Sequence, residues 1–265
     1  MKAVGYKKSL PIEAADALID FEAAKPEPKG RDIRVAVKAI SANPVDYKVR
    51  RRAAPPAGET KILGYDAAGV VDTVGPDVSL FKSGDEVFYA GSILIQLARR
   101  LTGLTVVATA TRPESQKWCF DLGAHAVIDH LKPMKDQIEQ VKVPPVALVA
   151  SLTFTEQHYK AIADLMAPQG KFGLIDDPGE FNVSVFKGKA ISVHWESMFT
   201  RSSFQTPDMI AQHHLLNDVA DLLDKGVLRT TLDQTFGTIN AANLKRAHAL
   251  LESGKSRGKI VLEGW

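Results

Sequence analysis

Hydrophobic residues along the chain follow two patterns that meet near residue 92. Before that point the apolar runs are short and broken by proline and glycine, as at residues 33–37 and 68–71. Such runs are typical of strands, and the segments 25–30, 74–77 and 82–85 have the composition of loops and turns. Residues 1–91 are therefore predicted to form a compact β-rich domain in which helical periodicity is weak.

After residue 92 the pattern alternates between helix and strand. Ile93, Leu97 and Leu101 recur on one helical face, and the apolar run that follows predicts a strand. Continued alternation predicts a parallel sheet with helices on both faces, so the fold class is α/β and residues 92–265 form the second domain. The predicted helices span 93–101, 113–122, 135–141, 155–166, 206–225 and 241–252; the predicted strands span 104–110, 126–129, 146–150, 171–175 and 259–262.

The charge is nearly balanced, with 33 lysines and arginines against 31 acidic residues. Because no basic face is concentrated, the sequence predicts no nucleic-acid partner. The one local cluster, Arg50–Arg52, is interpreted as a solvated loop. The first ten residues lack a sustained apolar stretch and no later run reaches membrane-spanning length, so no signal peptide and no membrane contact are expected.

The single cysteine, Cys119, excludes an intramolecular disulfide and a thiolate cluster. A reducing compartment is therefore expected, with the cytoplasm as the default location. The seven histidines show no spacing typical of a metal site, and each is interpreted as structural or as a surface residue. They lie at positions 125, 130, 158, 194, 213, 214 and 248.

Short motifs connect both halves with one known family. Residues 41–48, 63–71 and 84–87 resemble the N-terminal catalytic domain of the quinone oxidoreductase branch of the medium-chain dehydrogenase/reductase superfamily. Any of these alone could be a turn beside a strand, but their order and spacing agree. The second half is similar to the cofactor domain of the same family, at residues 92–100, 106–114, 121–124, 127–129, 165–170 and 258–262. In detail the chain is most similar to the zinc-type alcohol dehydrogenase-like group.

This resemblance implies a GroES-like β-rich domain followed by a doubly wound Rossmann domain. It implies an oxidoreductase that transfers hydride from NADPH to a small-molecule substrate of the quinone, enone or aldehyde class. It also implies a homodimer, formed through the last strand and the segment after Lys189. Zinc enzymes of the superfamily need thiolate and imidazole ligands, but this chain has Asn43-Pro44-Val45-Asp46 in the region of the first ligand. No metal is expected.

Two residues of the N-terminal motif are the candidate catalytic groups. Without a metal, negative charge that develops on the substrate must be met by hydrogen-bond donors. Asn43 and Tyr47 can donate as a neutral amide and a neutral phenol, and the resemblance implies that their motif lies near the nicotinamide. An Asn-Pro turn and a packed tyrosine are an equally weighted structural interpretation.

Cofactor preference is indicated at the end of the strand 105–110. NAD-preferring Rossmann domains place an acidic residue there, whereas this chain has Thr111 and Arg112. A guanidinium and a hydroxyl suit the 2′-phosphate of NADP, and Lys117 lies about one turn further along. An exposed arginine at a helix N-terminus is the structural alternative.

Further cofactor-binding residues are expected where the other strands end and where the first helix begins. Ligands of open α/β sheets bind at the carboxyl ends of the strands. These positions hold Ser151, Thr153, Gly173 and Ile175, and Ser92 opens the first helix of the second domain.

A block that the resemblance leads us to expect is missing between Gly91 and Ser92. No GxGxxG motif occurs in the chain, so the first Rossmann strand and its glycine-rich turn have no counterpart. Loss of that turn removes the main pyrophosphate site, and weak NADPH binding is expected. The alternative function is a non-catalytic remnant that dimerises or binds a partner.

Overall fold

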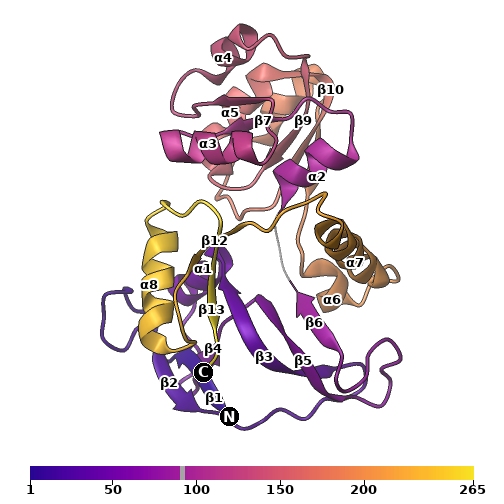
Figure 1. Cartoon of the computed structure of the whole chain (residues 1–265). Coiled ribbons are helices and arrows are strands. Elements are labelled where there is room, and N and C mark those ends of the chain that lie inside the picture. The colour runs from indigo at the N-terminus through magenta and orange to yellow at the C-terminus, as the bar shows by residue number, and fades with distance from the viewer. Residues whose placement is uncertain (90–92) are drawn as a thin grey trace. The chain divides into compact units, whose positions relative to one another are not determined.

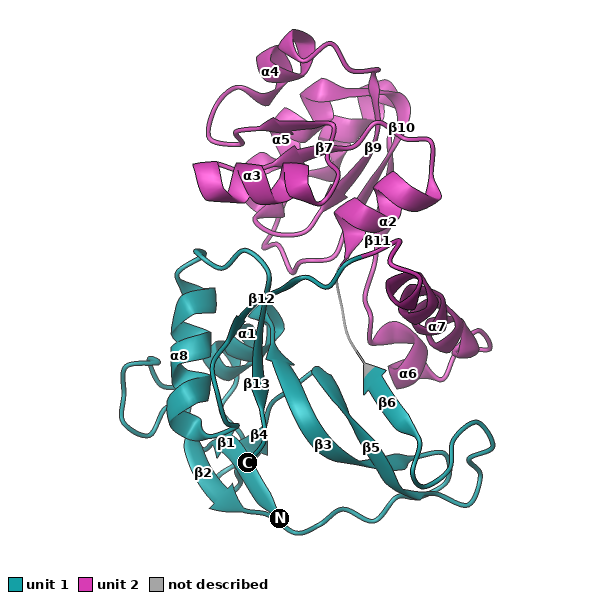
Figure 2. Ribbon diagram, in the orientation of Figure 1, with its two compact units in different colours: residues 1–92, 229–265 teal, residues 93–228 magenta. Residues whose placement is uncertain are grey.

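The computed structural model describes residues 1–89 and 93–265, and these fall into two compact units (Figure 2). Unit 1 consists of Met1–Ser92 together with Arg229–Trp265, and unit 2 of Ile93–Leu228. The C-terminal segment, which the sequence pattern assigned to the second domain, therefore belongs to the N-terminal unit. Each unit is described by itself. Among the described residues, no helix is long and apolar enough to cross a membrane.

Unit 1 contains two small sheets (Figure 1). The first has the order β2-β1-β4, formed by Ile19–Glu22, Lys2–Tyr6 and Lys61–Ile62. The second has the order β12-β13-β3-β5-β6, formed by Leu232–Thr235, Lys259–Glu263, Ile33–Ala42, Asp66–Val74 and Glu86–Tyr89. This arrangement confirms the β-rich N-terminal fold that the short apolar runs predicted.

The register of the larger sheet brings distant parts of the chain together. In the antiparallel pairs of β3, Ile260 of β13 lies opposite Ala42, and Asp66 of β5 lies opposite Ser41. Close approach of the strands requires Gly69 in β5, because a Cβ there would lie 2.3 Å from the carbonyl oxygen of Ala36. The C-terminal strand is therefore held inside the sheet, paired with β12 on one edge and β3 on the other.

Two helices pack on the core of unit 1: α1 (Pro44–Arg52) and α8 (Ala241–Glu252). The interpretation of Arg50–Arg52 as a solvated loop was wrong, because these residues form the last turn of α1. Arg50 is fully buried. Its guanidinium donates to the carboxylate of Glu252 and to the backbone carbonyl of Leu10. These partners, distant in the sequence, compensate for the burial of a charge that a local pattern assigns to solvent.

Unit 2 carries the predicted α/β alternation, which confirms the fold class (Figure 1). Strands β7 (Val107–Thr109) and β8 (Ala126–Ile128) form a parallel pair. Strands β9 (Val146–Ser151), β10 (Met166–Leu174) and β11 (Ser192–Trp195) form a parallel sheet with β10 in the centre. The helices that alternate with them are α2 (Leu94–Leu101), α3 (Pro113–Asp121), α4 (Met134–Gln140) and α5 (Thr155–Leu165), with a 3-10 helix over Val183–Lys189.

The predicted helix over 206–225 begins later than its hydrophobic pattern suggested. The structure has a short helix α6 (Thr200–Phe204) and then α7 (Ile210–Asp224). Between them Gln205 adopts a left-handed backbone conformation, and Asp208 accepts hydrogen bonds from Arg201 and from the Thr206 hydroxyl. Pro207 also lacks a backbone N–H. The apolar spacing therefore runs through a turn that ends one helix before the next begins.

The buried pair Arg50–Glu252 gives an asymmetric prediction for stability. Glu252→Ala leaves the buried guanidinium without its carboxylate and should lower the free energy of unfolding by about 3 kcal/mol. Arg50→Met should cost less, because the remaining Glu252 side chain is 19% exposed and can turn to solvent. Urea unfolding of both variants measures the difference. An equal or larger loss in Arg50→Met would contradict this account of the pair.

Candidate functional site

The candidate catalytic residue Asn43 lies where β3 passes into α1. Asn43 is the N-cap of α1, and its backbone N–H donates to Oδ2 of Asp46 at 2.7 Å. Its side-chain Nδ2 donates to the carbonyl oxygen of Ser41 at 3.2 Å, and its Oδ1 accepts a hydrogen bond from Nζ of Lys259. The amide of Asn43 is thus held from both ends, with one of its two Nδ2 hydrogens used.

Lys259 connects Asn43 to a buried carboxylate. Its Nζ lies 2.7 Å from Oδ2 of Asp66, whose side chain is 4% exposed. The sheet register explains the contact, because Lys259 starts β13 beside the end of β3 and Asp66 starts β5 on its other side. The ammonium group of Lys259 offsets the cost of burying the Asp66 carboxylate, and it also orients the side-chain amide of Asn43.

A second buried carboxylate lies beneath this contact. Burial raises the pKa of Asp46 from 3.8 to about 6; the backbone N–H of Asn43 lowers it, nearby Asp66 raises it and Lys259 lowers it. His248 of α8 is also buried, and burial lowers its pKa from 6.5 to about 4, with a smaller contribution from Arg50. Near pH 7 His248 is therefore neutral, whereas Asp46 is still mostly ionised but takes up a proton at a higher pH than an ordinary aspartate.

The other candidate catalytic residue, Tyr47, follows Asn43 by one turn of α1. Its ring is partly buried against the core of unit 1. Burial, and after it the charge of Glu252, raises the pKa of its phenol, so the hydroxyl keeps its proton at neutral pH. The charged groups that act on its phenol are Glu252, Arg51 and Arg52, whereas the Asn43 side chain contacts Ser41 and Lys259.

The predicted NADP-binding side chains of unit 2 lie at the end of β7. Arg112 is the N-cap of α3 and its side chain is 32% exposed. It donates to the Ser115 hydroxyl at 3.1 Å and lies 3.6 Å from the carboxylate of Glu114. Thr111 is partly exposed next to it. Lys117 is further along α3, 76% exposed and paired with Asp121 at 2.7 Å.

A buried hydrogen-bonded trio joins the carboxyl ends of β9 and β10. The Ser151 hydroxyl lies 2.7 Å from that of Thr155, which donates to Asp176 at 2.5 Å. The backbone N–H of Thr155 also donates to Asp176, at 3.0 Å. Ser151 is therefore occupied in holding the start of α5 against two strand ends.

The other residues predicted for this edge are more accessible. Thr153 is exposed, Ile175 is 53% exposed and Gly173 is half-buried. The backbone N–H of Ile175 donates to the carbonyl of Ser151, which keeps the two strand ends together. Ser92, predicted to open the first helix, and the junction with Gly91 lie outside the described residues. The structure thus groups Asn43 with Tyr47 in unit 1, and the cofactor candidates in unit 2.

A zinc ion does not fit the side chains that the structure describes. Within residues 1–89 and 93–265, no group of three or more histidine, cysteine or acidic side chains could hold a metal. Cys119, the only cysteine, is buried in unit 2, and burial raises the pKa of its thiol, which disfavours the thiolate that zinc requires.

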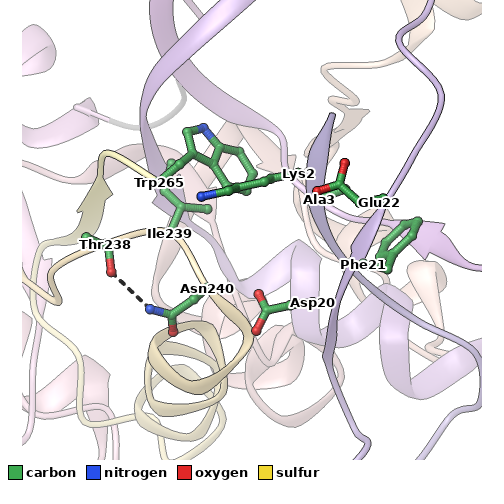
Figure 3. A pocket seen from close by; sticks show the side chains of 9 residues that line it. All are labelled: Lys2, Ala3, Asp20, Phe21, Glu22, Thr238, Ile239, Asn240 and Trp265. Carbon is green, nitrogen blue, oxygen red and sulfur yellow. Dashed lines mark hydrogen bonds between the residues drawn. The ribbon is translucent and has the colours of Figure 1, made fainter.

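One cavity of unit 1 does not coincide with the predicted site. It has a volume of about 400 Å³, and Figure 3 shows its lining of Lys2, Ala3, Asp20, Phe21, Glu22, Thr238, Ile239, Asn240 and Trp265. Two of these side chains have structural contacts: Asp20 accepts the backbone N–H of Ala241, and Asn240 caps α8. None of the predicted catalytic or cofactor residues lines it, so its size alone assigns it no role.

Sequence reasoning missed the residues that hold Asn43. Asp46 follows Asn43 by three residues, and this spacing of a capping box is the local signal that could have found it. Asp66 and Lys259 reach Asn43 only through the sheet register, which no local pattern reveals. His248 was interpreted only as structural or as a surface residue, and the return of α8 places it beside Asp46.

Two family models match the chain. Residues 122–262 match zinc-binding dehydrogenase, and residues 29–112 match the alcohol dehydrogenase GroES-like domain. A zinc-type alcohol dehydrogenase-like protein of Staphylococcus aureus is 30% identical, with 99% of each chain covered. That alignment runs over 336 positions although this chain has 265 residues, so at least 71 positions, the difference, have no residue here.

Solved structures show the same likeness. A Rhizobium etli protein, described as a candidate zinc-dependent alcohol dehydrogenase, is 46% identical with a TM-score of 0.94, over 100% of this chain and 98% of the other. The Escherichia coli quinone oxidoreductase complexed with NADPH is 18% identical with a TM-score of 0.80, over 99% and 100%. The second likeness concerns the fold alone.

The two buried groups Asp46 and His248 predict opposite dependences of stability on pH. The pKa of Asp46 is higher in the folded state, so the protein gains stability as the pH falls from about 6 to 3.8. The pKa of His248 is lower in the folded state, so the protein loses stability as the pH falls from 6.5 to about 4. Each shift corresponds to roughly 3 kcal/mol, so the effects nearly cancel. Asp46→Asn should therefore lose stability more steeply than the wild type below pH 6.5.

Urea unfolding between pH 4 and 7 measures these slopes. Asp16→Asn, which removes an exposed carboxylate of the same unit, is the matched control and should run parallel to the wild type. If the stability of Asp46→Asn also changes with pH in parallel with the wild type, the fold does not raise the pKa of Asp46.

Proposed function

Because the chain belongs to the medium-chain dehydrogenase/reductase superfamily, in its quinone oxidoreductase-like branch, we propose that it is a metal-independent oxidoreductase that uses NADPH to reduce a quinone, an enone or an aldehyde. The observation that carries this proposal is the side-chain amide of Asn43, which is held between Lys259 and the Ser41 carbonyl at the start of α1. The non-catalytic alternative is not favoured, since the relatives named above are described as dehydrogenases or oxidoreductases.

NADPH, when bound, supplies the hydride. On the protein side, the second Nδ2 hydrogen of Asn43 and the hydroxyl of Tyr47 would donate to the substrate oxygen as negative charge develops on it. Lys259 orients the Asn43 amide through Oδ1, so that Nδ2 keeps its donors. The raised pKa of Tyr47 keeps its hydroxyl a donor at neutral pH.

Arg112 and Thr111 would hold the 2′-phosphate of NADPH. The guanidinium is partly exposed just after the carboxyl end of β7, where Rossmann domains bind the adenosine ribose. Thr111 and Arg112 occupy the position at which NAD-preferring domains have an acidic residue. The exposed strand-end residues Thr153 and Ile175, with Gly173, would lie along the cofactor. Ser151, which is buried and already bonded to Thr155, would support this edge through its backbone.

A second copy of the chain is the proposed partner, with β11 as the contact. Within the described residues, β11 pairs only with β10, and Trp195 at its end is 62% exposed. The last strand, β13, is paired on both sides, so its backbone has no edge free for the subunit pairing expected from the sequence. A cytoplasmic location fits the free Cys119.

Metal independence can be tested with the same assay that tests the activity. Because the glycine-rich turn is missing, the chain should oxidise NADPH only slowly in the presence of a benzoquinone. Dialysis against a chelator should leave that rate unchanged, because the described side chains do not supply a zinc ligand set. Added zinc should not raise the rate. Stoichiometric zinc in the purified protein, together with activity lost on its removal, would overturn the metal-free mechanism.

The NADP assignment predicts a selective effect of Arg112→Ala. In a version of the protein that carries the glycine-rich turn, loss of a charge-assisted contact of roughly 1.5–3 kcal/mol should weaken NADPH binding about 10- to 100-fold and leave NADH binding unchanged. Calorimetric titration with both cofactors measures this. Lys135→Ala removes an equally positive, partly exposed side chain of unit 2 and serves as the control. Equal losses for NADPH and NADH would show that Arg112 is only a surface residue.

A further inference from the structure

A small cavity in unit 1 lies between β3, α1 and α8. Its volume is about 20 Å³, and its polar lining comes from Ser41, Asp46 and His248, among apolar residues that include Leu18 and Leu244. The two titratable side chains are almost completely buried, with Asp46 3% and His248 2% exposed. The cavity therefore lies between groups that bulk solvent does not reach.

Each of these three polar side chains has an atom that lacks a partner in the described part of the chain. These atoms are Ser41 Oγ, Asp46 Oδ1 and His248 Nδ1. A buried polar atom without a hydrogen bond lowers the stability of the fold by about 1–3 kcal/mol. Three such atoms would therefore destabilise unit 1 considerably if no ligand bonded to them. Because all three residues line this one cavity, a single ligand there can bond to all three atoms.

The volume and the donor balance identify that ligand. A cavity needs about 10–15 Å³ to hold one water molecule, so this one holds a single water and no larger molecule. A water molecule offers two donors and two acceptor positions and typically makes about three hydrogen bonds when buried. Two acceptors and one hydroxyl around the cavity match this requirement.

We infer that this cavity binds one water molecule, which accepts a hydrogen bond from the Ser41 hydroxyl and donates to Oδ1 of Asp46 and to Nδ1 of His248. The lowered pKa of His248 supports the arrangement, because a neutral imidazole can present Nδ1 as an acceptor. The water joins β3, α1 and α8. It also completes the bonding of the carboxyl that accepts the backbone N–H of Asn43 through Oδ2.

This inference does not depend on the proposed enzymatic activity, and a crystal structure of the whole chain at high resolution tests it directly. We expect one peak of electron density within 3.2 Å of all three atoms. Nitrogen NMR of His248 should show an unprotonated Nδ1 near pH 7, with magnetisation transfer from water to neighbouring protons. An empty cavity, or Asp46 and His248 in direct contact, would overturn the inference.

Two further experiments distinguish a water molecule from a cation and test the contact with Ser41. Crystals grown with rubidium in place of sodium should show no anomalous signal in the cavity, and a signal there would replace water with a cation. Ser41→Ala should lower or abolish the occupancy of the peak because one of its three partners is lost. Ser9→Ala, which removes an exposed hydroxyl bonded to the Arg51 carbonyl, should leave it unchanged. Full occupancy in Ser41→Ala would show that Ser41 is not a ligand.

Discussion

The antiparallel pairing of β13 with β3 is the constraint on which the rest of unit 1 depends. It joins two C-terminal strands, β12 and β13, to the N-terminal strands β3, β5 and β6 in one sheet. Lys259 thereby reaches both Asn43 and Asp66. The helix that precedes this strand, α8, supplies Glu252 to the buried Arg50 and His248 to the polar cavity. One backbone pairing thus assembles the charges and hydrogen bonds around the candidate catalytic residues.

Elements with strong local signals could be predicted closely. The helix at 241–252 and the strand beginning at Lys259 agree with the structure to within a residue, because apolar periodicity and nearby glycines mark them. Helix α1 could not be read in the same way. Its sequence is polar and ends in three arginines, and it depends on a capping interaction with Asp46 and on Glu252, 202 residues from Arg50. The cap is local, but the contact of Arg50 with Glu252 comes from tertiary structure.

In the candidate site, too, local signals could be recognised in the sequence and tertiary contacts could not. Asn43 and Arg112 could be singled out because each lies in a short motif beside a strand end. The environment of Asn43 could not, since Asp66 and Lys259 reach it only through the sheet register. Burial also changed the interpretation of some side chains: Ser151, predicted to contact cofactor, proved to be a buried partner of Thr155. Sequence therefore indicated the chemistry better than the contacts that orient it.

Unit 1 is discontinuous, and its two segments enclose the whole of unit 2. On the ribosome, residues 1–92 emerge first, and β13 leaves the exit tunnel only after the whole of unit 2. Until then β3 has one unpaired edge, and the nascent chain carries an incomplete sheet that invites association with other chains. Unit 2 is contiguous and can fold as soon as Leu228 has emerged. Vectorial synthesis therefore favours folding of the inserted unit first, and the sheet of unit 1 is completed once β13 has emerged.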